Sequence, residues 1–146
     1  VDNPDLINNV TDKIGRQCIV AAMDVKKEEE NKWVVYTHGG RKKTSLDALT
    51  WAIELDKRGA GEILLTSMDR DGTKKGFDTN LLKTISNHVD IPVIASGGAG
   101  ELEHLKDAIV LGNADAVLAA SIFHYSIFSI KEVKDYFKDN GVMVRS

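Results

Sequence analysis

The sequence has one cysteine, two prolines and no strong excess of charge of either sign. A single cysteine, Cys18, excludes an internal disulfide framework and suggests a reducing compartment; because it begins an apolar run, we expect a buried structural thiol. The net charge of −3 argues against nucleic acid and anionic membranes as partners. No apolar stretch reaches the roughly 18 residues that span a bilayer, and the first residues show no basic-then-apolar signal peptide. These absences predict a cytoplasmic protein.

What the sequence does contain is a regular alternation of short apolar runs and helical patterns. The runs are typical of strands covered on both faces, as in parallel sheets, and they span residues 18–23, 62–68, 92–95 and 116–120. Apolar side chains at helical spacing precede the first run and follow every run. The predicted order is therefore α-βα-βα-βα-βα, which implies a parallel sheet with right-handed crossovers.

Smaller features give the expected boundaries. Asn3 can cap the first helix, with Pro4 in its first turn. The charged segment 26–32 reads as a solvated turn, 33–36 as a short extra strand, and 39–43 as the return to a helix. Ser129 and Glu132 form a capping box at the start of the last helix.

Two architectures fit this order: a doubly wound open sheet and part of a (β/α)8 barrel. No Gly-x-Gly-x-x-Gly follows the first strand, which weakens the dinucleotide-binding version of the open sheet. In both architectures, functional groups lie at the carboxyl ends of the strands.

Two acidic and two amide-rich segments follow the predicted strands. They are Asp24, then Asp69-Arg70-Asp71-Gly72-Thr73, then Ser96-Gly97-Gly98, then Ala120-Ser121. Glycine lets the backbone approach an anion closely, and in TIM barrels a phosphate commonly lies between the last two strand-end loops. A glycine turn alone indicates only a tight turn, but the pair of neighbouring turns predicts a phosphate site.

The acids have two interpretations. A lone aspartate usually caps a helix or pairs with a cation, here Lys26 or Arg70. Asp24 differs because it directly follows an apolar run, where a carboxylate can exchange a proton with a substrate. Asp69 and Asp71 share one turn, and we expect one to be structural and the other to face the pocket. The four histidines have no metal-ligand spacing, so no metal site is expected.

Four stretches together resemble one enzyme family. They are "AAMDVKK", "KRGAGEILLTSMDRDGTKKGFD", "IPVIASGGAG" and "ADAVLAASIFH". They are similar to the cyclase subunit of imidazole glycerol phosphate synthase, an enzyme of histidine biosynthesis, and the resemblance covers essentially the whole chain. It implies a (β/α)8 TIM-barrel type of α/β fold, present here as a half-barrel of four βα units preceded by one helix.

The resemblance also implies an activity. The family converts a linear, bis-phosphorylated aminoimidazole carboxamide ribotide, with ammonia from a glutaminase subunit docked on the opposite face of the barrel, into imidazole glycerol phosphate and aminoimidazole carboxamide ribotide. It implies no cofactor. By motif, Asp24 matches the second of two catalytic aspartates and Asp71 an acid with a supporting role. Further matches are to phosphate-site and mouth-lining residues: Thr66, Ser96, Gly97, Gly98, Ala120 and Ser121.

The resemblance is to the carboxyl-terminal half of the barrel only, strands five to eight, which we expect residues 1–146 to form as a single structural unit. The first catalytic aspartate and the other phosphate site lie in the remaining half, so we expect no complete reaction from this chain alone. Two alternatives stay open: the sister isomerase of the pathway, which also carries the "DRDGT" turn, and a non-catalytic phosphate-binding half-barrel that self-associates. Inward-facing residues such as Val20, Leu64, Ile94 and Leu118 would lack their covering.

Overall fold

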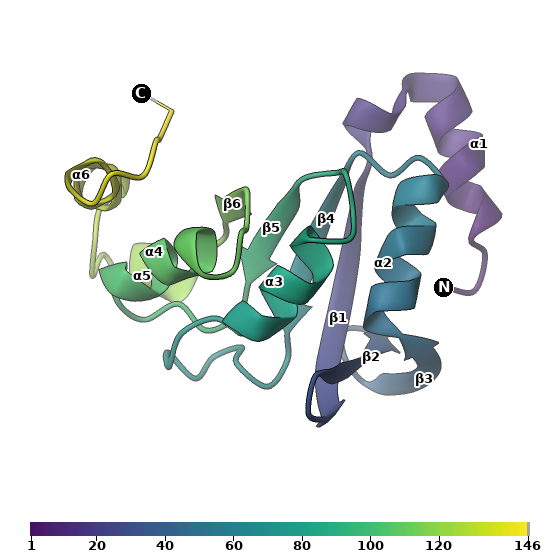
Figure 1. Ribbon diagram of the computed structural model, residues 1–146, viewed down its shortest axis with the longest axis horizontal. Coiled ribbons are helices and arrows are strands. Elements are labelled where there is room, and N and C mark those ends of the chain that lie inside the picture. Colours follow the sequence, from purple (N-terminus) through teal and green to yellow (C-terminus); the bar gives the residue numbers. More distant parts are fainter. Residues whose placement is uncertain (146) are drawn as a thin grey trace.

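The computed structural model describes residues 1–145, and one six-stranded sheet forms its centre (Figure 1). The strand order is β3-β2-β1-β4-β5-β6. Strands β1, β4, β5 and β6 are parallel, whereas β2 is antiparallel to both β1 and β3. The strands are β1 (Val20–Glu29), β2 (Lys32–Thr37), β3 (Lys42–Asp47), β4 (Glu62–Ser67), β5 (Val93–Ser96) and β6 (Ala116–Val117).

Helices connect the parallel strands, as the alternating pattern predicts. They are α1 (Asp5–Ile14), the short 3-10 helix η1 (Arg16–Cys18), α2 (Ala48–Lys57), α3 (Thr79–Ser86), α4 (Leu102–Val110), α5 (Ser121–His124) and α6 (Ile130–Asp139). The predicted capping box begins α6, with the Ser129 side chain accepting from the backbone of Glu132 and the Glu132 side chain accepting from the backbone of Ser129. The mixed α/β architecture and the four parallel strands are confirmed, and they are consistent with part of a barrel.

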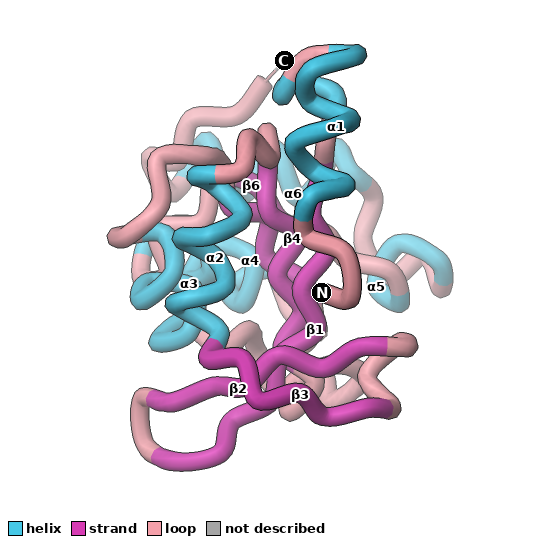
Figure 2. Tube along the Cα trace, turned by 90° about the vertical axis from the view of Figure 1, so that its right-hand side faces the viewer, coloured by secondary structure: helices cyan, strands magenta, loops and turns pink. Residues whose placement is uncertain are grey.

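The two faces of the parallel strands differ. Successive side chains of a strand point to opposite faces. On one face Ile63, Leu65 and Val93 are at most 1% exposed, because α2, α3 and α4 pack on them in one hydrophobic core (Figure 1). On the other face Val20 is 51% and Leu118 45% exposed. Seen from the side, α2 and α3 lie on one side of β1 and β4 (Figure 2).

The prediction of a solvated turn over residues 26–32 is wrong. Strand β1 continues through Lys26 to Glu29, and only Glu30 and Asn31 form the turn into β2. Asn31 has φ 56, a value that two-residue hairpin turns use. The charged residues of β1 lie on a ribbon that is exposed to solvent on both sides, so no alternation of apolar and polar residues reveals the strand.

The return to a helix after Gly39 also comes later than predicted. His38, Gly39 and Gly40 all have positive φ and form a turn, after which β3 pairs with β2. Helix α2 begins only at Ala48, with Asp47 as its cap: the Asp47 carboxylate accepts a hydrogen bond from the Thr50 N–H at 2.8 Å. The hairpin thus adds two antiparallel strands beside Asp24.

Two predictions about the first twenty residues are wrong. No side chain caps α1, because Pro4 occupies the N-cap position in a helical conformation and the first free N–H groups reach the backbone oxygens of Asn3 and Pro4. Cys18 is exposed, since it lies in η1 before the chain enters the sheet. Helix α1 contributes no fully buried side chain; polar contacts hold it to the end of α2, among them Arg58 Nη1 to Asp5 Oδ1 at 2.8 Å.

Candidate functional site

Three of the predicted site residues form one row across the sheet. The register places Asp24 of β1 beside Thr66 of β4, and Thr66 beside Ser96 of β5. The residue before each of them is buried under the helices, so all three face the uncovered side, and each is half-buried. Neighbouring strands lie about 4.8 Å apart, so the row is about 10 Å long. It lies near the carboxyl edge of the parallel strands, where functional groups of this architecture gather.

The prediction that Asp24 ends its strand is wrong in detail. Pairing of β1 with β4 stops at Val25, but β1 continues because β2 pairs with it on the other side, with Asp24 opposite Tyr36. Asp24 is therefore near the end of the parallel part of the sheet and at the start of the hairpin.

Asp24 lines a groove of about 380 Å³ that runs between α1 and the free edge of β1. Tyr36, Thr37 and His38 line the same groove. Within residues 1–145 the Asp24 carboxylate makes no hydrogen bond or salt bridge, so neither helix capping nor pairing with Lys26 accounts for it. A half-buried carboxylate without a partner at this edge is free to act on a ligand.

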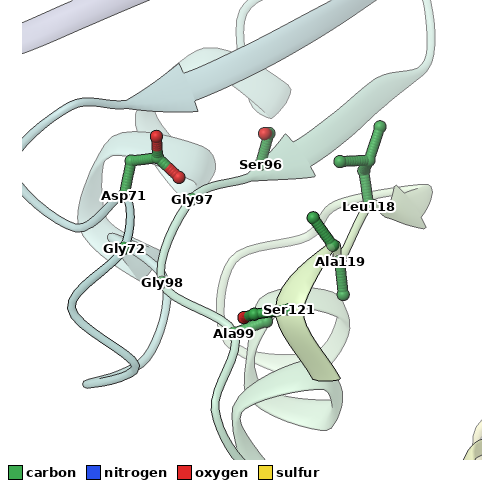
Figure 3. Close-up of a pocket in the computed structure, with 10 residues that line it drawn as sticks. Asp71, Gly72, Ser96, Gly97, Gly98, Ala99, Leu118, Ala119 and Ser121 are labelled. Atoms are coloured by element: carbon green, nitrogen blue, oxygen red, sulfur yellow. The ribbon is translucent and has the colours of Figure 1, made fainter. Parts of the chain in front are cut away.

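A separate pocket of about 210 Å³ collects most of the other predicted residues. Its lining consists of Asp71, Gly72, Ser96, Gly97, Gly98, Ala99, Leu118, Ala119, Ala120 and Ser121. Asp71 lies on one wall, the segment from Leu118 to Ser121 on the opposite wall, and the glycine turn after Ser96 between them (Figure 3). Asp24 lines a different depression, and Thr66 lines neither, although the row described above connects the two.

The backbone gives this pocket its chemistry. The N–H groups of Gly97, Gly98, Ala120 and Ser121 donate no hydrogen bond to another atom of residues 1–145. Gly97 and Gly98 are nonetheless buried. Because an unpaired buried N–H is costly, such groups are normally satisfied by water or by the oxygens of a ligand. Together with the unpaired N–H groups of the exposed Ala120 and the half-buried Ser121, these donors around one cavity favour an anion.

The glycines are also required by packing. Gly97 and Gly98 have φ 89 and 112, and a Cβ would lie 2.8 Å from the Ser67 oxygen at Gly97 and 2.2 Å from the Gly76 oxygen at Gly98. Any side chain there would therefore be strained and would collide with the end of β4 or with the segment that follows it. The sequence indicated close approach of an anion, whereas the structure adds close approach of the protein's own backbone.

The two acids of the turn after β4 face different ways. The Asp69 carboxylate accepts a hydrogen bond from the Lys27 N–H at 2.7 Å, which makes it a structural link to β1. Asp71 lines the pocket, and its own N–H donates to the Ser67 oxygen at 2.9 Å. The structure therefore divides the pair as the sequence suggested, one structural and one facing the pocket.

Sequence reasoning missed several contributors. Gly72, Ala99, Leu118 and Ala119 also line the pocket, and only their position beside predicted residues could have indicated them. At the helices outside the pocket, hydrogen bonds from Lys106 to Glu103, from Ser129 to Glu132 and from Lys131 to Asp135 lower the pKa of those three acids. Within residues 1–145, no three histidine, cysteine or acidic side chains gather to hold a metal ion, and no helix is long and apolar enough to cross a membrane.

A family model described as "Histidine biosynthesis protein" matches residues 1–129. The match includes every residue of the row and of the pocket and ends as α6 begins. This family consists of TIM-barrel-type enzymes and includes both the isomerase and the cyclase of histidine biosynthesis. The four parallel strands, with polar residues at their carboxyl edge, agree with that architecture. The chain belongs to the histidine biosynthesis protein family.

Proposed function

We propose that this chain supplies the carboxyl-terminal half of the barrel of a cyclase subunit of imidazole glycerol phosphate synthase. In this proposal residues 1–146 are one structural unit that corresponds to strands five to eight. The substrate is a bis-phosphorylated aminoimidazole carboxamide ribotide, the nitrogen comes as ammonia from a glutaminase subunit, and the products are imidazole glycerol phosphate and aminoimidazole carboxamide ribotide.

One observation carries the proposal: an unpaired carboxylate and a cavity with four free amides lie at the two ends of a single polar row. The amides of Gly97, Gly98, Ala120 and Ser121 bind one phosphate of the ribotide. Thr66 and Ser96 offer hydroxyl groups to the body of the substrate. Asp24, about 10 Å from Ser96 by strand spacing, exchanges a proton with the ring that forms.

Asp71 has a supporting role in this arrangement. Its carboxylate shares the pocket with the amides, and an anion held there experiences repulsion from it. We therefore assign Asp71 to contacts with hydroxyl or N–H groups of the ribotide beside the phosphate, where a carboxylate accepts hydrogen bonds.

The opposite half of the active site has to come from another chain segment. The uncovered face of the parallel strands and the free edge of β1 are where that segment packs. The sister isomerase uses the same family architecture, and the "DRDGT" turn does not separate the two. The cyclase is favoured by the longer stretches "SMDRDGTKKGFD" and "AASIFH".

A complementation assay tests the function. The chain is co-expressed with the amino-terminal half of a cyclase of this family and supplied with the ribotide and ammonium. We expect imidazole glycerol phosphate to form. Asp24→Asn should lower the rate by about 10²–10⁴-fold, because an amide keeps the shape but cannot carry the proton. In a parallel assay that supplies the precursor of the ribotide, isomerisation without any cyclisation in the first assay would identify the sister enzyme. An Asp24→Asn variant within about threefold of wild type would remove Asp24 from the mechanism.

A further inference from the structure

The segment between β4 and α3, residues 68–78, connects the pocket with the hairpin of β1 and β2. We call it the β4–α3 loop. Its first end is fixed on β1 by two hydrogen bonds: the Met68 N–H donates to the Val25 oxygen at 2.9 Å, and the Asp69 carboxylate accepts from the Lys27 N–H at 2.7 Å. The loop therefore begins from a position set by the hairpin strand.

The second end of the loop is fixed by one carboxylate with two partners. Asp78 Oδ1 accepts from the Leu81 N–H at 3.0 Å and thereby caps α3. Asp78 Oδ2 accepts from the indole N–H of Trp33 on β2, also at 3.0 Å. Trp33 is only 3% exposed, so water competes poorly for this charge-assisted bond. A single side chain thus joins the hairpin to the start of the helix.

The middle of the loop forms part of the pocket. The Gly76 N–H donates to the Gly98 oxygen at 2.8 Å, which ties the loop to the glycine turn. Asp71 of the same loop lines the pocket opposite Leu118 to Ser121 (Figure 3). A displacement of the loop would therefore change both the wall that carries Asp71 and the turn that carries two of the free amides.

We propose that Trp33 is a positioning residue for the phosphate pocket, acting through Asp78 and the β4–α3 loop. This inference rests on the proposed binding of phosphate by the pocket. The indole N–H holds Asp78, Asp78 fixes the end of the loop, and Gly76 transmits that position to Gly98. Without this hydrogen bond the loop has more freedom, and each bound phosphate has to restrict that freedom again.

The test compares two tryptophan variants. Trp33→Phe keeps an aromatic ring in the core and removes the indole N–H donor together with the volume of the second ring. Trp51→Phe is the matched control, because Trp51 is also buried, at 8% exposed, and its indole N–H bonds to no atom of residues 1–145. Inorganic phosphate is titrated into each protein while the amide signals of Gly97 and Gly98 are followed by NMR. We expect Trp33→Phe to bind phosphate about fivefold more weakly than wild type, whereas Trp51→Phe binds like wild type.

A second variant changes the acceptor of the same hydrogen bond, Asp78, instead of the donor. Asp78→Asn keeps an oxygen that can cap α3 but loses the charge and one acceptor. Its phosphate affinity should fall as in Trp33→Phe, and the double variant should be no weaker than either single variant, because both remove one interaction. Full additivity would show that the two residues act separately and would overturn the inference.

Amide hydrogen exchange provides a readout that needs no ligand. The N–H groups of Asp71 and Gly76 are hydrogen-bonded within the pocket wall, and Trp33→Phe should speed their exchange about tenfold. If exchange and phosphate affinity are unchanged while the melting temperature falls, Trp33 is merely structural and the inference is wrong. If phosphate leaves the Gly97 and Gly98 signals of the wild type unmoved, the phosphate proposal fails, and the exchange rates alone decide whether Trp33 fixes the loop.

Discussion

The two faces of the parallel strands differ in burial although the same strands build both. Leu64 and Leu65 are neighbours in β4, yet Leu65 is 1% exposed beneath the helices and Leu64 is only half-buried on the other face. The helical face is completed by this chain's own α2, α3 and α4. The uncovered face carries the row of Asp24, Thr66 and Ser96. The face that folding completes provides stability, and the face that it leaves uncovered carries the residues that we propose to act on the substrate.

The largest expected effect comes from the matched pair of leucines. Leu65→Ala removes a side chain from the closed core and should lower the free energy of unfolding by about 2–5 kcal/mol. Leu64→Ala loses only partial burial and should cost about 1 kcal/mol or less. Denaturant unfolding of both variants at low protein concentration measures the difference. Equal losses would mean that the two faces are equally well packed.

Association of the 146-residue chain is the next effect in size. The free edge of β1 and exposed apolar residues such as Val20 and Leu118 favour self-association, and two copies would supply eight parallel strands, enough to fill a barrel with side chains. We expect sedimentation at micromolar concentration to show dimers or larger species. The double variant Val20→Asp with Leu118→Asp should weaken association at least about tenfold, because charges would enter the apolar interface.

The control for this experiment is a charge placed on the helical side of the sheet. Val110 at the end of α4 is 54% exposed, close to the 51% of Val20. Val110→Asp should leave the sedimentation pattern unchanged. A wild-type chain that sediments as a monomer at all concentrations would contradict the predicted self-association through the uncovered face.

The smallest expected effect concerns α6, which packs against α4. Hydrogen bonds from Ser129, first from its backbone N–H and then from its hydroxyl, lower the pKa of Glu132 below its usual 4.5. A lowered pKa in the folded state means that the stabilisation is present above pH 4.5 and is lost as the pH falls through the folded value. The amides at the start of α6 should therefore lose exchange protection in acid. Glu132→Gln keeps the cap without a titrating group, and its protection at these amides should depend less on pH.

The βα units could be predicted because their signals are local. Apolar runs mark the buried strands, and Asp78, Ser129 and Glu132 are recognisable at helix starts. The short strand over 33–36 was predicted and is part of β2. The continuation of β1 was not, because Lys26 to Glu29 are exposed on both sides and their charges suggested a loop. For the pocket, the strand-end rule indicated residues that the structure brings together around one cavity, among them Ser96, Gly98 and Ser121.

The parts that could not be predicted depend on contacts between distant residues. Trp33 and Asp78 are 45 positions apart, and a tryptophan in an apolar strand reads simply as core. Asp69 and Asp71 are equivalent in the sequence, and only the pairing of Asp69 with Lys27 separates them. Likewise, the collision between a Gly98 side chain and Gly76 depends on how the β4–α3 loop passes the glycine turn.

The hairpin of β1 and β2 sets a limit on any strand that joins the sheet. Because β2 pairs with β1 from Asp24 onward, only the part of β1 before Asp24 has a free edge on that side. A parallel strand added there, whatever chain it belongs to, has to stop level with Met23. The hairpin therefore limits the length and fixes the register of the incoming strand. As a result, the last residue of that strand and the loop that follows it lie directly beside the Asp24 carboxylate.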